Sequence, residues 1–225
     1  MLNINVLLCG ILAFYCIHNA YGFLDVHIHF SKGGLKGKMN QEQCSHLDKS
    51  MVKREEWDAM SPRQTFETQG IGKDVIIWQT GSETCNLIGL GQSTCERCLH
   101  DAGCIKRVIL ALQKDDLDYG LDDIKYHFLI DEEGVIYEGR GWDVAGQHAV
   151  GVNARSIDVA VVGDFTHTGP SEAAQDSLNR LILCGMRSSK LLYSSQLIVT
   201  PSRAGRAFYD VTAKCHGLCV AEPQK

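Results

Sequence analysis

The chain has 225 residues, with 22 Lys and Arg against 27 Asp and Glu, and a formal net charge of −5. This length fits one domain of ordinary size with a single active or binding site. The lack of a long run of one charge excludes nucleic-acid binding through a basic face, whereas small ligands and glycans stay open.

The first 22 residues have the pattern of an export signal. An uninterrupted apolar run from Val6 to Ile17 precedes the small residues Ala20 and Gly22. The alternative is a membrane anchor, but the run is shorter than the roughly 20 residues that a bilayer span needs. We therefore expect a signal peptide over 1–22 and a secreted, extracellular chain without a membrane span.

Cysteines are frequent in this chain. Of the ten, Cys9 and Cys16 would leave with the signal, and eight would remain. An even number in an exported chain favours disulfides over free thiols. The alternative is a zinc site formed by the C-x-x-C at 95–98 and the C-H-x-x-C at 215–219. Export makes disulfides the preferred interpretation.

The region after the signal divides into three predicted parts. Residues 23–43 are rich in Gly, Lys and His without sustained periodicity, and we expect a flexible leader. One domain is predicted over 44–219, and a polar tail follows over 220–225.

Strand and helix patterns alternate along the domain. The apolar, β-branched run 75–78 predicts a buried strand. A helix is predicted next, because its apolar residues fall at i, i+3, i+4 and i+7, which places them on one face. These residues are Ile105, Val108, Ile109 and Leu112.

The second half of the domain contains a predicted hairpin, a strand and a helix. Residues 126–130 and 135–137 are expected to pair through a turn with Gly134 in a left-handed conformation. A strand follows over 159–162. Ser171 is predicted to cap a helix that Gly185 ends. The predicted fold class is α/β with a mixed sheet.

One long stretch carries a family resemblance. Residues 126–142, with the sequence YHFLIDEEGVIYEGRGW, and then GQH at 146–148 and NARSI at 153–157, closely resemble peptidoglycan recognition proteins. Flanking matches extend the similarity over roughly 44–200. The resemblance implies a single domain with a central mixed β-sheet flanked by helices, and a groove for a muropeptide.

The resemblance also implies how some cysteines pair. Two family disulfides match Cys44 with Cys184 and Cys85 with Cys104. The loop between Cys85 and Cys104 is longer than is usual in the family. It carries two further cysteines, and sequence leaves open whether these pair locally or with the C-terminal cluster. The four unassigned cysteines are Cys95, Cys98, Cys215 and Cys219.

Amidase members of this family hold zinc with two histidines and a cysteine, and the metal activates a water. The positions of the two histidines match Trp78 and Pro201 in this chain, and no Cys-Pro-Gly follows. An indole has no free lone pair for zinc. We therefore expect no metal, no cofactor and no catalytic residue.

The resemblance places several residues in the ligand groove. A polar, partly aromatic groove suits a ligand made of sugar, amide and carboxylate groups. Members that prefer diaminopimelate-type stems carry an arginine at the position of Arg140 and Gly-Trp where this chain has Gly120-Leu121. An arginine can grip the extra carboxylate of that stem. The other expected groove residues are Gln79, Thr80, Tyr126, His148 and Asn153.

The predicted function is that of a secreted, non-catalytic pattern-recognition protein of innate immunity. Its expected partners are bacterial peptidoglycan or muropeptides, with a preference for the diaminopimelate type, and a downstream immune signalling protein. One alternative is a divergent zinc-dependent N-acetylmuramoyl-L-alanine amidase. Another is a decoy or co-receptor whose groove is blocked by the loop between Cys85 and Cys104.

Overall fold

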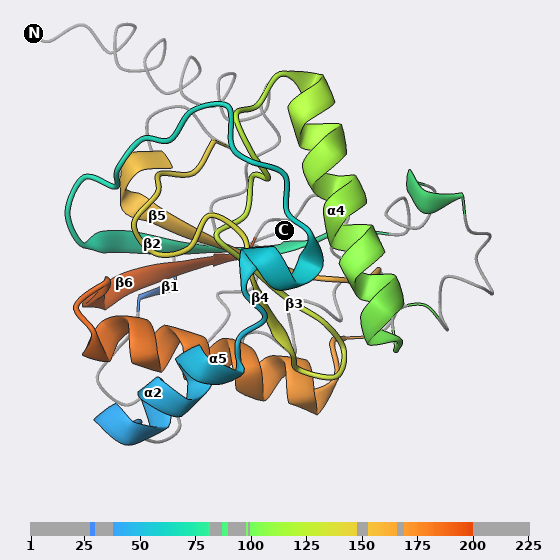
Figure 1. Cartoon of the computed structure of the whole chain (residues 1–225). Coiled ribbons are helices and arrows are strands. Elements are labelled where there is room, and N and C mark those ends of the chain that lie inside the picture. Colours follow the sequence, from blue (N-terminus) through green and yellow to red (C-terminus); the bar gives the residue numbers. More distant parts are fainter. Residues whose placement is uncertain are drawn as a thin grey trace, which may run out of the picture.

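A computed structural model describes the protein over residues 28–29, 38–81, 87–89, 98, 100–147, 153–165 and 169–199. These residues form a six-stranded sheet with the order β1-β6-β2-β5-β3-β4 (Figure 1). The strands are β1 Ile28–His29, β2 Gly72–Gln79, β3 Phe128–Ile130, β4 Ile136–Glu138, β5 Ser156–Val161 and β6 Leu191–Val199. The helices are α2 Gln41–Ser50, η1 Arg54–Trp57, α4 Ala102–Tyr119, η3 Asn153–Arg155 and α5 Glu172–Arg187.

The sheet is mixed. Strand β2 runs parallel to both β5 and β6, and β3 runs parallel to β5. The two edge strands are antiparallel to their neighbours, β1 to β6 and β4 to β3. The predicted α/β class with one central mixed sheet is confirmed.

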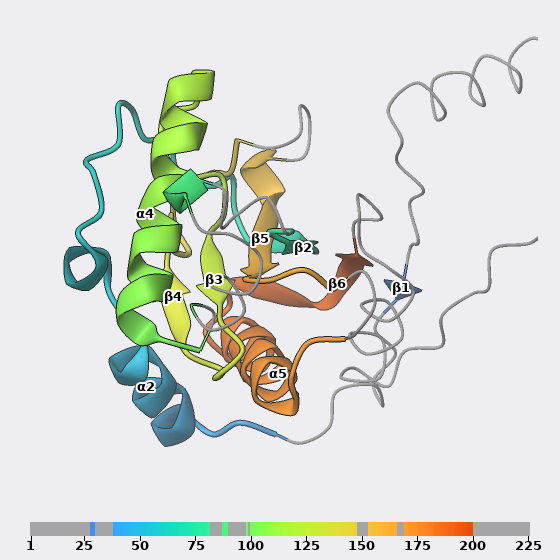
Figure 2. The ribbon, with the colours of Figure 1, turned by 90° about the vertical axis from the view of Figure 1, so that its right-hand side faces the viewer.

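Helices cover both faces of the sheet. Helices α2 and α5 pack together against one face, and α4 packs against the other (Figure 2). Side-chain alternation along β2 separates the two cores, since Val75 and Ile77 belong to the α5 core and Trp78 belongs to the α4 core. We call these the α5 face and the α4 face.

Helix α4 follows its predicted pattern, since all four predicted face residues are buried. Asp101 caps its start by accepting a hydrogen bond from the Cys104 backbone N–H at 2.7 Å. Gly120 ends it with φ at 104°. Because this φ is left-handed, a glycine at this position costs the least strain.

The hairpin prediction is confirmed, and one helix end was predicted wrongly. β3 and β4 pair around Gly134, which has φ at 78°. Ser171 caps α5 as expected, but the helix continues past Gly185 to Arg187. A Cβ at position 185 would lie 2.6 Å from the Trp142 ring. Gly185 therefore allows close packing inside the helix and does not end it.

One of the two predicted disulfides is confirmed and the other is corrected. Cys44 and Cys184 are bonded and join α2 to α5. Cys104 pairs with Cys98 and not with Cys85. The additional loop stretch puts Cys98 only six residues before Cys104, in the same buried cluster. The nearer cysteine thus takes the bond that the family pattern gives to Cys85.

The leader contributes to the fold. β1 pairs with β6. Helix α2 begins at Gln41, where Asn40 and Gln43 form a reciprocal capping box. The ordered fold thus includes part of the segment that we expected to be a flexible leader. No helix within the described ranges is long and apolar enough to cross a membrane.

Several predictions fall outside the described residues. They are the signal peptide at 1–22, the tail at 220–225, and the positions Cys85, Cys95, His148, Pro201, Cys215 and Cys219.

Candidate functional site

Trp78, which the resemblance places at the first metal-ligand position, lies near the end of β2. Its side chain is half-buried and lies on the α4 face. The indole Nε1–H donates a hydrogen bond to Oδ1 of Asp158 at 3.1 Å. Asp158 lies on the neighbouring strand β5 and is fully buried. This bond fixes the orientation of the indole ring.

His127 lies against the same carboxylate. Its Nδ1 accepts a hydrogen bond from the Asp158 backbone N–H at 2.9 Å and lies 3.2 Å from Oδ2 of Asp158. The ring is fully buried, and its Nε2 has no hydrogen-bond partner among the described residues. These contacts hold the imidazole beside the buried carboxylate.

The residues Trp78, Asp158 and His127 therefore form one chain of polar contacts on the α4 face. Sequence reasoning missed Asp158 and His127. The available signal was Asp158, a charged residue among the apolar residues of 157–161. A buried carboxylate needs polar partners, so such a residue points to a polar site.

Tyr126 packs beside this chain. Its ring centroid lies 6.4 Å from that of Trp78, with the planes tilted by 58°. Only 4% of Tyr126 is exposed. Burial raises the pKa of the phenol, and the Asp116 and Asp158 carboxylates act in the same direction. Tyr126 is therefore a neutral, buried phenol over the physiological pH range.

An ion pair borders Tyr126. Lys125 places its Nζ 5.3 Å from the centroid of the Tyr126 ring and 3.2 Å from Oδ1 of Asp116. Burial raises the pKa of the Asp116 carboxyl, and the Lys125 ammonium opposes this shift. Lys125 thus stabilises a carboxylate in a poorly hydrated position.

Arg140 is directed into the protein. The residue is 6% exposed, and its guanidinium donates four hydrogen bonds to acceptors of the protein itself. The acceptors are the carbonyl oxygens of Ile124 at 2.6 Å, Ala145 at 3.0 Å and Asp123 at 3.3 Å, and Oε1 of Gln147 at 2.9 Å. Arg140 therefore ties the segment 122–124 to the segment 145–147.

Gln79 lies away from the other predicted groove residues. The alternation of β2 puts it on the α5 face, where its Oε1 accepts a hydrogen bond from the Phe165 N–H at 2.7 Å. It is buried there. A strand turns successive side chains to opposite faces, so Gln79 cannot share a surface with its neighbour Trp78.

The remaining predicted groove residues lie at the ends of elements. Thr80 follows β2 and accepts a hydrogen bond from the Gly163 N–H at 3.0 Å. Gly120 and the half-buried Leu121 end α4. Asn153 is half-buried at the start of η3.

The described residues at this site do not fit a zinc ion. Trp78 lies at the position that the resemblance gives to the first histidine ligand. Its ring offers no lone pair for a metal, and its N–H is bonded to Asp158. Within the described ranges, no group of three His, Cys, Asp or Glu side chains could hold a metal ion.

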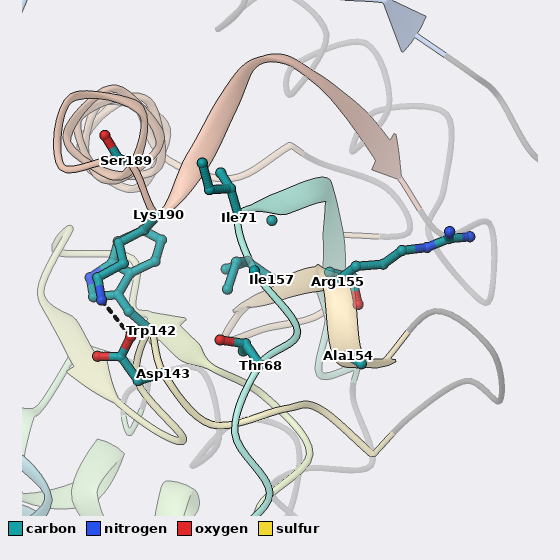
Figure 3. A pocket seen from close by; sticks show the side chains of 12 residues that line it. Thr68, Ile71, Trp142, Asp143, Ala154, Arg155, Ile157, Ser189 and Lys190 are labelled. Atoms are coloured by element: carbon teal, nitrogen blue, oxygen red, sulfur yellow. Dashed lines mark hydrogen bonds and ion pairs between the residues drawn. The ribbon is translucent and has the colours of Figure 1, made fainter.

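A separate cavity of about 140 Å³ lies at the other end of β2. Figure 3 shows Thr68, Ile71 and Ile157 around it, with the ion pair between Lys190 and Asp143 at one side. None of the predicted groove residues lines this cavity.

Comparison with known proteins gives a consistent result. The family model described as N-acetylmuramoyl-L-alanine amidase matches residues 89–211. The chain is 37% identical over 188 residues to peptidoglycan-recognition protein SA of Drosophila melanogaster, an alignment that covers 81% of this chain and 86% of the relative. It is 32% identical over 171 residues to a peptidoglycan recognition protein of Trichoplusia ni, covering 72% and 85%.

A solved structure shows the same fold. The structure of PGRP-Hd from Alvinella pompejana superimposes with a TM-score of 0.68 and 46% sequence identity. The match covers 76% of this chain and 98% of that one.

Proposed function

This chain belongs to the peptidoglycan recognition protein family, and from that premise we propose that it binds bacterial peptidoglycan or muropeptides without hydrolysing them. In this proposal the protein is a secreted pattern-recognition protein of innate immunity, which passes the binding signal to a downstream immune protein.

One observation carries the non-catalytic part of the proposal. Trp78 stands where the amidase-type site needs a histidine, and its hydrogen bond to Asp158 holds the indole in that place. A zinc hydrolase needs three protein ligands and an open position for water. A site that lacks one ligand and holds a large ring in its place does not support that chemistry.

A preference for diaminopimelate-type stems is the finer part of the proposal. Its support is the presence of Arg140 and Gly120 at the positions that the resemblance associates with that preference. In the structure Arg140 holds the two segments at 122–124 and 145–147 together. We therefore propose that it contributes by shaping these segments, since gripping a ligand carboxylate would require it to release internal acceptors.

A divergent amidase is the second candidate function. The observation in its favour is the match of residues 89–211 to the amidase family model. This function would require zinc ligands other than the residue at position 78.

A pull-down on insoluble peptidoglycan, combined with metal analysis of the purified full-length protein, tests the proposal. We expect retention on peptidoglycan, zinc well below one ion per chain, and no release of stem peptides. The variant Trp78→His alone should not produce turnover, because one ligand does not rebuild a three-ligand site. Chelator-sensitive amidase turnover of the wild type would overturn the non-catalytic assignment, and failure to bind peptidoglycan would overturn recognition itself.

A further inference from the structure

Trp78 and Tyr126 are the two aromatic rings of the α4-face site, and they differ in accessibility. Tyr126 is 4% exposed, whereas Trp78 is only half-buried. Their rings are in tilted contact at 6.4 Å between centroids. Of the two rings, Trp78 is therefore the one that a ligand can contact. Tyr126 packs against it from the core side.

The position of Trp78 is fixed before any ligand binds. Its N–H is bonded to Asp158, and Asp158 is fully buried and held in turn against His127. A side chain that is already ordered loses little conformational entropy when a ligand packs on it. This arrangement favours a binding role for Trp78.

The chemistry of the half-buried indole favours one part of a peptidoglycan ligand. The face of an indole is large, apolar and electron-rich, so it attracts the polarised C–H groups of a flat ligand surface. The stem peptide presents mainly amides and carboxylates, which need polar partners. The only polar group of Trp78 is already used by Asp158, and the ring therefore suits a sugar, whose ring has faces lined by C–H groups.

We propose that Trp78 contacts a sugar ring of the glycan strand through the face of its indole, with Asp158 and His127 as positioning residues. This inference rests on the proposed function. It makes the residue at the former metal position a determinant of ligand specificity.

The test compares two ligands that differ in the sugar alone, a disaccharide-tetrapeptide muropeptide and the free tetrapeptide stem. Calorimetric titration of the full chain gives the affinity for each. We expect Trp78→Ala to weaken muropeptide binding tenfold or more and to change stem-peptide binding less than twofold. Trp78→Phe keeps an aromatic face and should lose less than Trp78→Ala. Asp158→Leu removes the acceptor of the indole N–H and should weaken muropeptide binding by threefold or more, whereas Asp158→Asn keeps an acceptor and should lose less.

Trp142→Phe is the matched control, because Trp142 packs on Phe128 in the other core, at 4.6 Å between centroids. It should bind both ligands like the wild type. Muropeptide should also quench the fluorescence of the wild type and of Trp142→Phe, but not that of Trp78→Phe.

Two results separate the possible failures. If the folded wild type binds the muropeptide and Trp78→Ala binds it equally well, or loses both ligands equally, Trp78 is not a sugar contact and the proposed function stands. If the wild type binds neither ligand, the proposed function fails and this inference fails with it.

Discussion

At the scale of single residues, Arg140 shows how burial changes the interpretation of a motif. Its guanidinium donates to four internal acceptors, three of them backbone carbonyls. We expect Arg140→Met to lower the free energy of unfolding by about 2 to 4 kcal/mol, because buried carbonyls lose charged donors. Urea denaturation measures this change.

Arg63 provides the control for Arg140. Its side chain is exposed and, among the described residues, donates one hydrogen bond, to the Leu121 carbonyl at 3.2 Å. Arg63→Met should therefore cost no more than about 0.5 kcal/mol. Equal stability of the two variants would contradict a structural role for Arg140 and would favour direct contact with the stem peptide.

The ion pair between Asp116 and Lys125 predicts a pH-dependent effect. The folded protein holds the proton of Asp116 more tightly than the unfolded chain does, since burial raises its pKa. This carboxyl therefore favours folding below its unfolded pKa of about 3.9, and the contribution is lost as the pH rises through the folded pKa.

Lys125→Met removes the cation that stabilises the ionised form of Asp116. We expect a loss of about 1 to 3 kcal/mol at pH 7, because the carboxylate is left without its partner in a partly exposed pair. The loss should shrink as the pH falls through the raised folded-state pKa of Asp116, because the protonated carboxyl no longer needs a cation. Lys53→Met is the control, since the pair of Lys53 with Asp48 is more exposed. A loss for Lys125→Met that does not depend on pH would contradict this account.

At the scale of elements, one glycine lies inside α4 and a second caps its end, and the same substitution should have opposite effects at the two positions. Gly103 lies in the first turn, where an added Cβ would meet only Oδ1 of Asp101, at 3.4 Å. Gly120 has φ at 104°, and an added Cβ would meet no atom within 4 Å. The cost of a side chain at this position is therefore backbone strain alone. Gly103→Ala should stabilise the protein by about 0.5 to 1 kcal/mol, and Gly120→Ala should destabilise it by about 1 kcal/mol. Thermal unfolding followed by circular dichroism distinguishes the two signs, and a shift of both variants in the same direction would count against this account.

The two described disulfides close loops of very different length. Cys44–Cys184 spans 140 residues and Cys98–Cys104 spans 6. Loop-closure entropy then predicts a cost of about 5 kcal/mol for removing the first by paired serine substitutions, and about 2 kcal/mol for the second. Denaturation of the two double variants tests the order of these costs. Non-reducing peptide mapping should find both pairs, and recovery of Cys85 linked to Cys104 would overturn the pairing described above.

At the scale of the whole molecule, the two cores share one sheet. Leu178 of α5 lies in one core and Ile109 of α4 in the other, and both are 1% exposed or less. Strand β2 contributes side chains to both cores. The two halves should therefore unfold together in one transition.

Truncation in either core tests this coupling. Leu178→Ala and Ile109→Ala should each cost about 2 to 5 kcal/mol. Tryptophan fluorescence and far-ultraviolet circular dichroism should report the same midpoint in each variant. Two separate transitions would show that the faces unfold independently.

The sequence by itself determined the family, the α/β class, the face of α4, the hairpin around Gly134 and the cap at Ser171. Each of these depends on a local pattern or on a long ordered motif. Apolar spacing, turn glycines and capping residues act within a few positions of the chain, so they can be read before the fold is known.

Only the tertiary structure decided the contacts between distant segments. Trp78 and Asp158 are 80 positions apart, and Ile124 and Arg140 lie 16 positions apart on either side of the hairpin. The structure also decided that Cys104 bonds with Cys98, where the family pattern pairs it with Cys85. Burial and hydrogen bonding depend on which strands become neighbours. The pairing of β5 with β2 on one side and with β3 on the other places the indole, the carboxylate and the imidazole together. No local pattern in the sequence encodes these pairings.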